Sequence, residues 1–234
     1  MTDKIVGVIG GMGPEATVDL MQRVIQTTPA QDDIDHIRMI VDNNPKVHSR
    51  IKAIIEGTGE SPAPILIQMG SKLEAYGADF LVIPCNTAHY YLNDIRSAVS
   101  IPVIDMIELT VDAVLREHPA LKTVGLLASQ AVLQTGLYRK RFGEGGVDLT
   151  YPQDELQGKL MNAIRTIKTG CYGAGEKTIL RSAADDMIKR GAEALIVACT
   201  ELSLIADVLD PEPEVYDSAQ ILAEAVVHIA KEKT

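Results

Sequence analysis

The two halves of this sequence carry the same series of segments in the same order. Three pairs of segments match, at offsets of 118, 114 and 112 residues: Lys4–Ile9 with Lys122–Leu127, Gly77–Thr87 with Gly191–Glu201, and Pro102–Asp105 with Glu214–Asp217. The offset drifts smoothly, as expected of a duplication followed by a few deletions. The repeat therefore predicts two similar lobes related by a pseudo-twofold axis.

Apolar segments rich in β-branched residues alternate with longer amphipathic segments along each half. This alternation is typical of parallel sheets flanked by helices. The expected strands are Lys4–Gly10, His36–Val41, Asp79–Pro84, Pro102–Ile104, Thr123–Ala128, Val147–Thr150, Ala194–Ala198 and Glu214–Tyr216. The predicted fold is α/β, with two doubly wound parallel-sheet lobes and the active site in the cleft between them. We place the first lobe at residues 1–100, completed by a C-terminal helix over 217–234, and the second at 101–212.

Composition and charge argue against several kinds of partner. The formal net charge is −10, and the Lys and Arg residues are scattered, which disfavours a surface for nucleic acid or for an anionic membrane. No apolar stretch approaches the roughly 18 residues of a membrane span, and the N-terminus lacks the features of a signal peptide. We therefore expect a cytoplasmic protein with reduced thiols. Neither a CxxC nor an HExxH motif occurs, so no metal site is expected.

Two of the three cysteines occupy equivalent positions in the repeat. Cys85 and Cys199 each stand eight residues after the glycine of a Gly-Ala-acid turn, at the end of an apolar segment. Ligands of open α/β sheets bind at the carboxyl ends of strands, so a pseudo-twofold axis can bring both thiols to one ligand. A single buried cysteine is usually a small core residue, but two at matched strand ends favour a functional pair. Cys171 lies outside the repeat, and we assign it no role.

Two facing thiols suit a racemisation, in which one base removes the Cα proton and the other returns a proton to the opposite face. An unperturbed thiol has a pKa of about 8.5, which allows it to act as acid or base after modest tuning. Both cysteines precede an expected helix, whose N-terminus favours the thiolate. The backbone N–H groups of Asn86, Thr87, Thr200 and Glu201 can hold an α-carboxylate and stabilise the charge that develops on deprotonation.

A side-chain carboxylate on the substrate would need a cation. Arg50 and Lys168 are candidates because they obey the repeat, at an offset of 118 residues. A lone Arg or Lys on a helix is usually solvated surface, and the spacing alone does not distinguish the two interpretations.

The glycine-rich segment after the first strand permits a rival interpretation. Gly11–Ala16 fits the loose dinucleotide pattern G-x-G-x-x-G/A. However, Pro14 removes a backbone N–H from the loop that would cradle a pyrophosphate, and no acidic residue stands at the end of a second strand about 20 residues later. The glycines instead predict a tight turn where the backbone approaches a small ligand, with Met12 lining the pocket. No cofactor is therefore predicted. His89 is expected to make a structural hydrogen bond in the first turn of a helix, so no catalytic histidine is predicted either.

These motifs together resemble the aspartate/glutamate racemase family, and specifically its aspartate racemase branch. The resemblance covers nearly the whole chain, through Gly10–Pro14, Asn44–Arg50, Pro84–His89, Ile167–Lys168 and Cys199–Glu201. It implies a two-lobed α/β fold with the site between the lobes, a homodimer, and a mechanism without pyridoxal phosphate. The implied roles are an acid/base pair at Cys85 and Cys199, α-carboxylate contacts at Asn86, Thr87, Thr200 and Glu201, and side-chain carboxylate recognition at Arg50 and Lys168.

Differences from glutamate racemases favour aspartate as the substrate. Those enzymes carry an acidic residue and a serine in the first loop, where this chain has Gly10–Met12, and a histidine where this chain has Glu201. Ala198 stands where glycine is commoner, and we do not expect its methyl group to abolish the chemistry. The expected activity is the interconversion of L- and D-aspartate, with glutamate or broad-specificity racemisation as the alternative. A non-catalytic protein that binds acidic amino acids stays open. So does a one-cysteine decarboxylase or cis–trans isomerase, which the matched cysteines disfavour.

Overall fold

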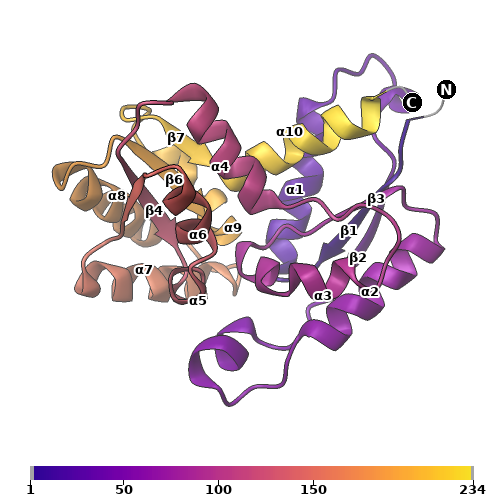
Figure 1. The fold of residues 1–234 in the computed structure, drawn as a ribbon, viewed down its shortest axis with the longest axis horizontal. Helices are drawn as coiled ribbons and strands as arrows, with labels where there is room; N and C mark the ends of the chain where they lie inside the picture. Colours follow the sequence, from indigo (N-terminus) through magenta and orange to yellow (C-terminus); the bar gives the residue numbers. More distant parts are fainter. Residues whose placement is uncertain (1–2, 233–234) are drawn as a thin grey trace. The chain divides into compact units, whose positions relative to one another are not determined.

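The computed structural model describes residues 3–232 (Figure 1). The chain divides into two units: unit 1 runs from the N-terminus to Met106 and includes the C-terminal segment from Ala219, and unit 2 comprises Ile107–Ser218. Every strand pair in both units is parallel. The predicted α/β fold with two parallel sheets is therefore confirmed. The lobe boundaries given above remain a prediction.

Unit 1 is built on a sheet with the strand order β2-β1-β3. Its strands are β1 (Val6–Gly10), β2 (Met39–Asn43) and β3 (Phe80–Val82), and an isolated parallel bridge joins Leu81 to Val103. Its helices are α1 (Pro14–Thr27), α2 (Ala63–Ala75), α3 (Leu92–Arg96) and, except for its first residue, α10 (Ser218–Lys231), with 3₁₀ turns at Asp33–Asp35 and Asn86–Tyr91 and a π-helical turn at Lys52–Glu56. Helices α1 and α10 lie on one side of this sheet, and α2 and α3 lie on the other (Figure 1).

Unit 2 repeats this arrangement with the strand order β5-β4-β6-β7. Its strands are β4 (Thr123–Ala128), β5 (Asp148–Thr150), β6 (Ala194–Ala198) and β7 (Val215–Asp217). Its helices are α4 (Met106–Glu117), α5 (Gln130–Thr135), α6 (Leu137–Glu144), α7 (Asp154–Ile167), α8 (Ala174–Lys189) and α9 (Thr200–Ser203). The first residue of α4 belongs to unit 1, and a 3₁₀ turn covers Ala206–Val208. The order matches unit 1 position by position, with β7 in the place of the Val103 bridge, as the duplication predicts.

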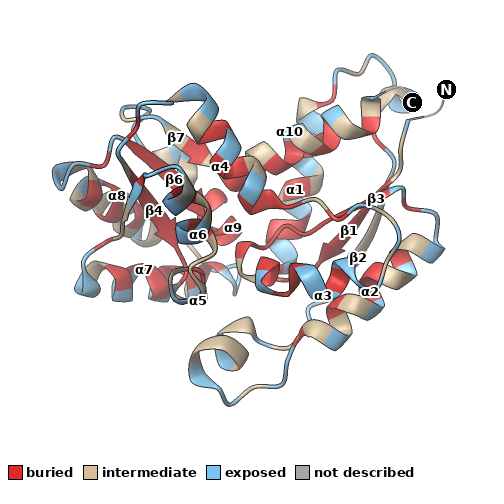
Figure 2. Cartoon of the chain, in the orientation of Figure 1, coloured by how far each residue is buried: buried red, intermediate tan, exposed pale blue. Residues whose placement is uncertain are grey.

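The central strands are buried along their whole length. All residues of β1 and β6 are buried, and so are all residues of β4 after Thr123 (Figure 2). Strands covered on both faces need apolar residues at every position rather than at alternate ones, which explains the continuous apolar segments in the sequence. Among residues 3–232, no helix is both long enough and apolar enough to cross a membrane.

Two strand predictions need correction. Strand β2 begins at Met39 rather than His36. The chain before it forms a 3₁₀ turn over Asp33–Asp35, in which the Asp32 side chain accepts a hydrogen bond from the backbone of Asp33, and His36 caps the end of that turn. Pro102–Ile104 forms no full strand. It makes two backbone hydrogen bonds to Leu81: the Pro102 carbonyl accepts one, and the Ile104 N–H donates the other. Pro102 has no N–H with which to donate a further hydrogen bond.

Equivalent glycines bring a strand close to its neighbours in each unit. A Cβ atom on Gly7 would lie 2.6 Å from Cδ2 of Leu81, and one on Gly125 would lie 2.5 Å from Cδ2 of Leu195. Each glycine pairs with that same leucine across the sheet. The duplication therefore extends from the sequence to the packing of the core.

Replacing Gly125 by alanine is expected to lower the free energy of unfolding by about 1–3 kcal/mol, because the added methyl group overpacks the core against Leu195. The matched control is Gly158→Ala within α7, where no atom apart from its chain neighbours and the adjacent backbone of the same helix lies within 4 Å of the added Cβ. That change is expected to raise stability by up to about 1 kcal/mol through helix propensity. Urea unfolding of both variants measures the difference, and an equal response of the two would contradict the packing argument.

Candidate active site

The glycine-rich loop after β1 makes the predicted tight turn. Gly11 has a φ of +91°, and a Cβ atom there would lie 2.2 Å from the backbone carbonyl carbon of Asn44, so only glycine fits. The Gly11 N–H donates to Oγ1 of Thr17 at 2.8 Å, and the Thr17 hydroxyl donates to the Gly13 carbonyl at 3.1 Å. The backbone that approaches Gly11 is that of Asn44.

Met12 and Arg50, both predicted as binding residues, lie in contact in unit 1. The Arg50 guanidinium donates from Nη2 to the Met12 carbonyl and from Nη1 to the His48 carbonyl, each at 3.2 Å. The Met12 side chain is buried in the core cluster on the α2 side of the sheet. Burial raises the pKa of the nearby Tyr91 hydroxyl, and the charge of Arg50 opposes that rise. Arg50 thus fixes the glycine-rich loop and places a half-buried positive charge beside it.

Cys85 stands three residues beyond the end of β3 and precedes the 3₁₀ turn Asn86–Tyr91 as its N-cap. Its side chain is 6% exposed. Its backbone N–H donates to the Ile83 carbonyl at 2.7 Å. Asn86 and Thr87 are the first two residues of the turn, so their backbone N–H groups lie at a helical N-terminus, as predicted.

His89 holds the Cys85 segment in place. Its Nδ1 lies 2.9 Å from the Cys85 carbonyl, and the Met106 N–H donates to its Nε2 at 3.1 Å. A carbonyl can only accept a hydrogen bond and a backbone N–H can only donate one, so the proton resides on Nδ1 and the ring is neutral. The predicted structural hydrogen bond of His89 is confirmed.

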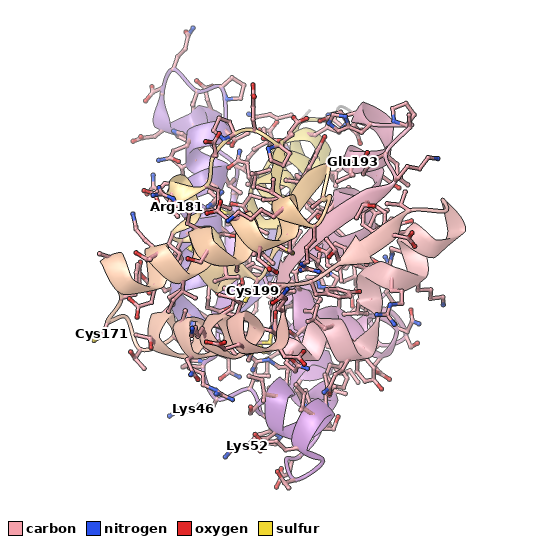
Figure 3. The ribbon with its side chains drawn as sticks, turned by 90° about the vertical axis from the view of Figure 1, so that its left-hand side faces the viewer. Lys46, Lys52, Cys171, Arg181, Glu193 and Cys199 are labelled. Atoms are coloured by element: carbon pink, nitrogen blue, oxygen red, sulfur yellow. The ribbon has the colours of Figure 1, made fainter. Side chains whose placement is uncertain are left out.

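Cys199 immediately follows β6 and is the N-cap of α9. Figure 3 labels it together with Glu193, which lies at the opposite end of the same strand, and with Cys171 on an exposed loop. Cys199 is 6% exposed, and its thiol donates to Oε2 of Glu201 at 3.2 Å. The Lys168 ammonium lies 3.1 Å from Oε1 of Glu201, in ion-pair contact but off the direction of a hydrogen bond. Three residues predicted separately therefore form one cluster.

Burial and two charged neighbours act on the Cys199 thiol. Burial raises the pKa of the Cys199 thiol well above its usual range, the Glu201 carboxylate raises it further, and Lys168 opposes both effects. This direction is opposite to the effect of a helix N-terminus, which favours the thiolate. Helix α9 has only four residues, and a carboxylate in contact with the sulfur outweighs the partial charge of such a short helix.

The Glu201 side chain also limits what the predicted substrate contacts can be. It points at Cys199 and Lys168, and a carboxylate there would repel the α-carboxylate of an amino acid. Any contact of Glu201 with that group must come from its backbone N–H. Thr200, the first residue of α9, is buried beside it.

Sequence reasoning missed Gln157 of α7. Its side chain is buried, and its Nε2 donates to the Ala128 carbonyl at the end of β4 at 3.0 Å. Its Oε1 has no hydrogen-bond partner within the described part of the chain. The available signal was a glutamine on the apolar face of a helix, in line with Leu160, Met161 and Ile164. Within residues 3–232, no three His, Cys, Asp or Glu side chains are grouped so as to hold a metal ion.

Comparison with known proteins agrees with this arrangement. The sequence model of the Asp/Glu/hydantoin racemase family matches residues 9–226. The broad specificity amino-acid racemase RacX of Bacillus subtilis is 29% identical over 236 residues, which cover 95% of this chain and 96% of that protein. The glutamate racemase of Persephonella marina is 26% identical over 163 residues, covering 67% of this chain and 60% of that protein.

The solved structure of the Picrophilus torridus aspartate racemase superposes with a TM-score of 0.82 and 30% identity, covering 98% of this chain and 95% of that one. This similarity extends over both parallel sheets and over the strand ends that carry the two buried cysteines. The chain therefore belongs to the Asp/Glu/hydantoin racemase family and is a cofactor-independent racemase, an isomerase.

Proposed function

We propose that this protein interconverts L- and D-aspartate, with Cys85 and Cys199 as the two bases of a direct proton transfer. The observation that carries this proposal is the presence of two buried thiols at equivalent positions of the repeat, each the N-cap of a helical segment. A structural role explains one buried cysteine. It does not explain why both halves of the chain keep a cysteine there.

The reaction needs no other chemical group. The thiolate of one cysteine takes the Cα proton, and the thiol of the other delivers its own proton to the opposite face of the same carbon. The proton count is unchanged, and the two cysteines exchange protonation states, so the reverse reaction uses each in the other role. The backbone N–H groups at the starts of the Asn86–Tyr91 turn and of α9 bind the α-carboxylate and stabilise the charge that it accumulates.

Recognition of aspartate rests on Arg50. Its guanidinium is half-buried and anchored on the Met12 and His48 carbonyls through two of its five N–H groups. A planar fork of donors held in this way suits a carboxylate. The similarity to an aspartate racemase over nearly the whole chain supports the same substrate.

One observation favours broad specificity as the second candidate. Lys168, the other cation predicted to read the side-chain carboxylate, is already paired with Glu201. A paired cation attracts a substrate carboxylate less than an unpaired one does, which would admit amino acids without an acidic side chain. The similarity to a broad specificity racemase is consistent with this alternative.

The direct test is proton NMR of the purified protein with L-aspartate, L-glutamate or L-alanine in heavy water. We expect the Cα proton signal of L-aspartate to disappear as D-aspartate forms, because the returning proton comes from a thiol that has exchanged with solvent. Equal rates with alanine would replace the aspartate proposal by broad specificity. No exchange with any of the three, in folded and reduced protein, would leave a non-catalytic amino-acid-binding protein.

We also propose a homodimer that works in the cytoplasm, where Cys85, Cys171 and Cys199 stay reduced thiols. All three are free cysteines in the structure. The proposed ligand is a small acidic amino acid, and the net charge of −10 does not favour nucleic acid as a partner.

A further inference from the structure

We infer that Glu201 is a positioning residue that keeps the proton on Cys199 between turnovers, so that the free enzyme presents Cys199 as the proton donor. The inference rests on the proposed role of Cys199 as one of the two bases. It concerns a residue that sequence reasoning placed only at the α-carboxylate.

The geometry around Cys199 is built from one buried carboxylate and one cation. Oε2 of Glu201 accepts a hydrogen bond from the Cys199 thiol at 3.2 Å, while Oε1 lies 3.1 Å from the Lys168 ammonium. The Glu201 side chain is 7% exposed and the Lys168 side chain 32% exposed, so water screens the carboxylate little. Glu201 is the second residue of α9 and Cys199 is its N-cap, so the short helix fixes their separation.

This arrangement favours the thiol over the thiolate. A thiolate at Cys199 would place a second negative charge about 3 Å from a buried carboxylate, and like charges this close are not both ionised without a large cost. Lys168 offsets part of that cost. The thiol, in contrast, satisfies Oε2 with a hydrogen bond. Glu201 and Lys168 therefore act on the Cys199 proton in opposite directions, in agreement with the causes of its raised pKa.

Other charged side chains of the elements packed against α9 have partners of their own. On α7, Lys159 pairs with Glu155 at 2.6 Å, and Arg165 donates to Oδ1 of Asn162 at 3.2 Å. Asp207, in the 3₁₀ turn after α9, pairs with Lys177 at 2.8 Å. Asp217, at the end of β7, accepts a hydrogen bond from the Ser203 hydroxyl at 2.6 Å. The balance at Cys199 is thus set by Glu201 and Lys168.

In unit 1 the repeat puts different residues at the positions of this pair. The repeat places neutral Thr87 at the position of Glu201, at the same offset of 114 residues that relates the two cysteines. Arg50, at the position of Lys168, binds two backbone carbonyls. The two halves therefore treat their cysteines differently, and the proton of the free enzyme is assigned to Cys199.

The test measures the alkylation rate of each cysteine by iodoacetamide between pH 6 and 11.5, in the full chain without substrate, by peptide mass spectrometry. Glu201→Gln keeps the shape and an acceptor oxygen but removes the charge, and Lys168→Met removes the cation. We expect the pH midpoint for Cys199 to fall by at least about one unit in Glu201→Gln, which is a roughly tenfold faster alkylation below the midpoint. In Lys168→Met the midpoint is expected to rise.

A change of access to the sulfur would alter the rate at every pH but would leave the midpoint in place, so the midpoint separates charge from structure. Glu193→Gln, at the other end of β6, is the matched control and should leave the midpoint unchanged. Exposed Cys171 calibrates the reagent in each sample. An unmoved midpoint in folded Glu201→Gln, or shifts of the same sign in both site variants, would overturn the inference. Because no turnover is needed, a wild type without racemase activity contradicts the proposed function and leaves this measurement intact.

Discussion

Cys85→Ala and Cys199→Ala are each expected to lose about 10²–10⁴-fold of the racemase turnover of the wild type, the range typical of a missing general acid or base. Each variant retains one base, so a proton taken from one face of Cα cannot be replaced on the other face. Both side chains are small and buried, so thermal unfolding of each variant must first show a folded protein. Cys171→Ala, on an exposed loop, is the matched control and should keep full turnover.

Isotope exchange in the same variants shows which face of Cα each cysteine serves. A single remaining cysteine can remove the Cα proton and return a solvent deuteron to the same face. In heavy water, each variant should therefore label only one enantiomer of aspartate without inverting it, and the two variants should label opposite enantiomers. Near-wild-type racemisation in both directions by either variant would contradict the two-base mechanism, and so would labelling of the same enantiomer by both variants.

Arg50→Ala is expected to lower kcat/KM for aspartate by about 10- to 150-fold. That range corresponds to the roughly 1.5–3 kcal/mol of a hydrogen bond to a charged group, at about 1.4 kcal/mol per factor of ten. The physical reason is the loss of the cation that we propose for binding the substrate's side-chain carboxylate. Steady-state kinetics with aspartate and with alanine, measured on the same preparations, give the effect and its specificity.

Alanine is the essential comparison because Arg50 also anchors the glycine-rich loop through the Met12 and His48 carbonyls. Loosening of that loop would slow both substrates alike, whereas loss of carboxylate recognition slows aspartate alone. Arg50→Lys keeps the charge without the planar fork and should give an intermediate loss. Wild-type protein that racemises alanine and aspartate at one rate, or an Arg50→Ala variant that loses both equally, would refute this role for Arg50.

The sequence alone determined the features that recur in both halves. The repeat predicted the parallel α/β architecture and placed Cys85 and Cys199 ahead of equivalent helical segments, and both are N-caps in the structure. These features depend on local patterns, in which a buried strand, a turn and a helix start follow one another within about a dozen residues. Two copies of one pattern reinforce each other, so the prediction holds even where a single copy would be ambiguous.

Strand limits were less predictable at the sheet margins. Strand β2 is half-exposed along its length, so its apolar pattern is weak and its start was misplaced by three residues, at His36 instead of Met39. The Pro102–Ile104 segment reached only an isolated bridge at Val103. Pairing at an edge depends on one neighbouring strand, and its extent is set by contacts that the local sequence does not record.

Tertiary structure alone decided how the charged residues pair. Glu201 contacts Lys168 across 33 residues of chain, and Arg50 contacts the Met12 carbonyl across 38. The repeat aligned Arg50 with Lys168 and so predicted equal roles, yet one cation binds two carbonyls and the other binds a carboxylate. The surroundings of Cys199 followed the same rule, because the Glu201 carboxylate that lies 3.2 Å from its sulfur is a contact that the sequence did not predict.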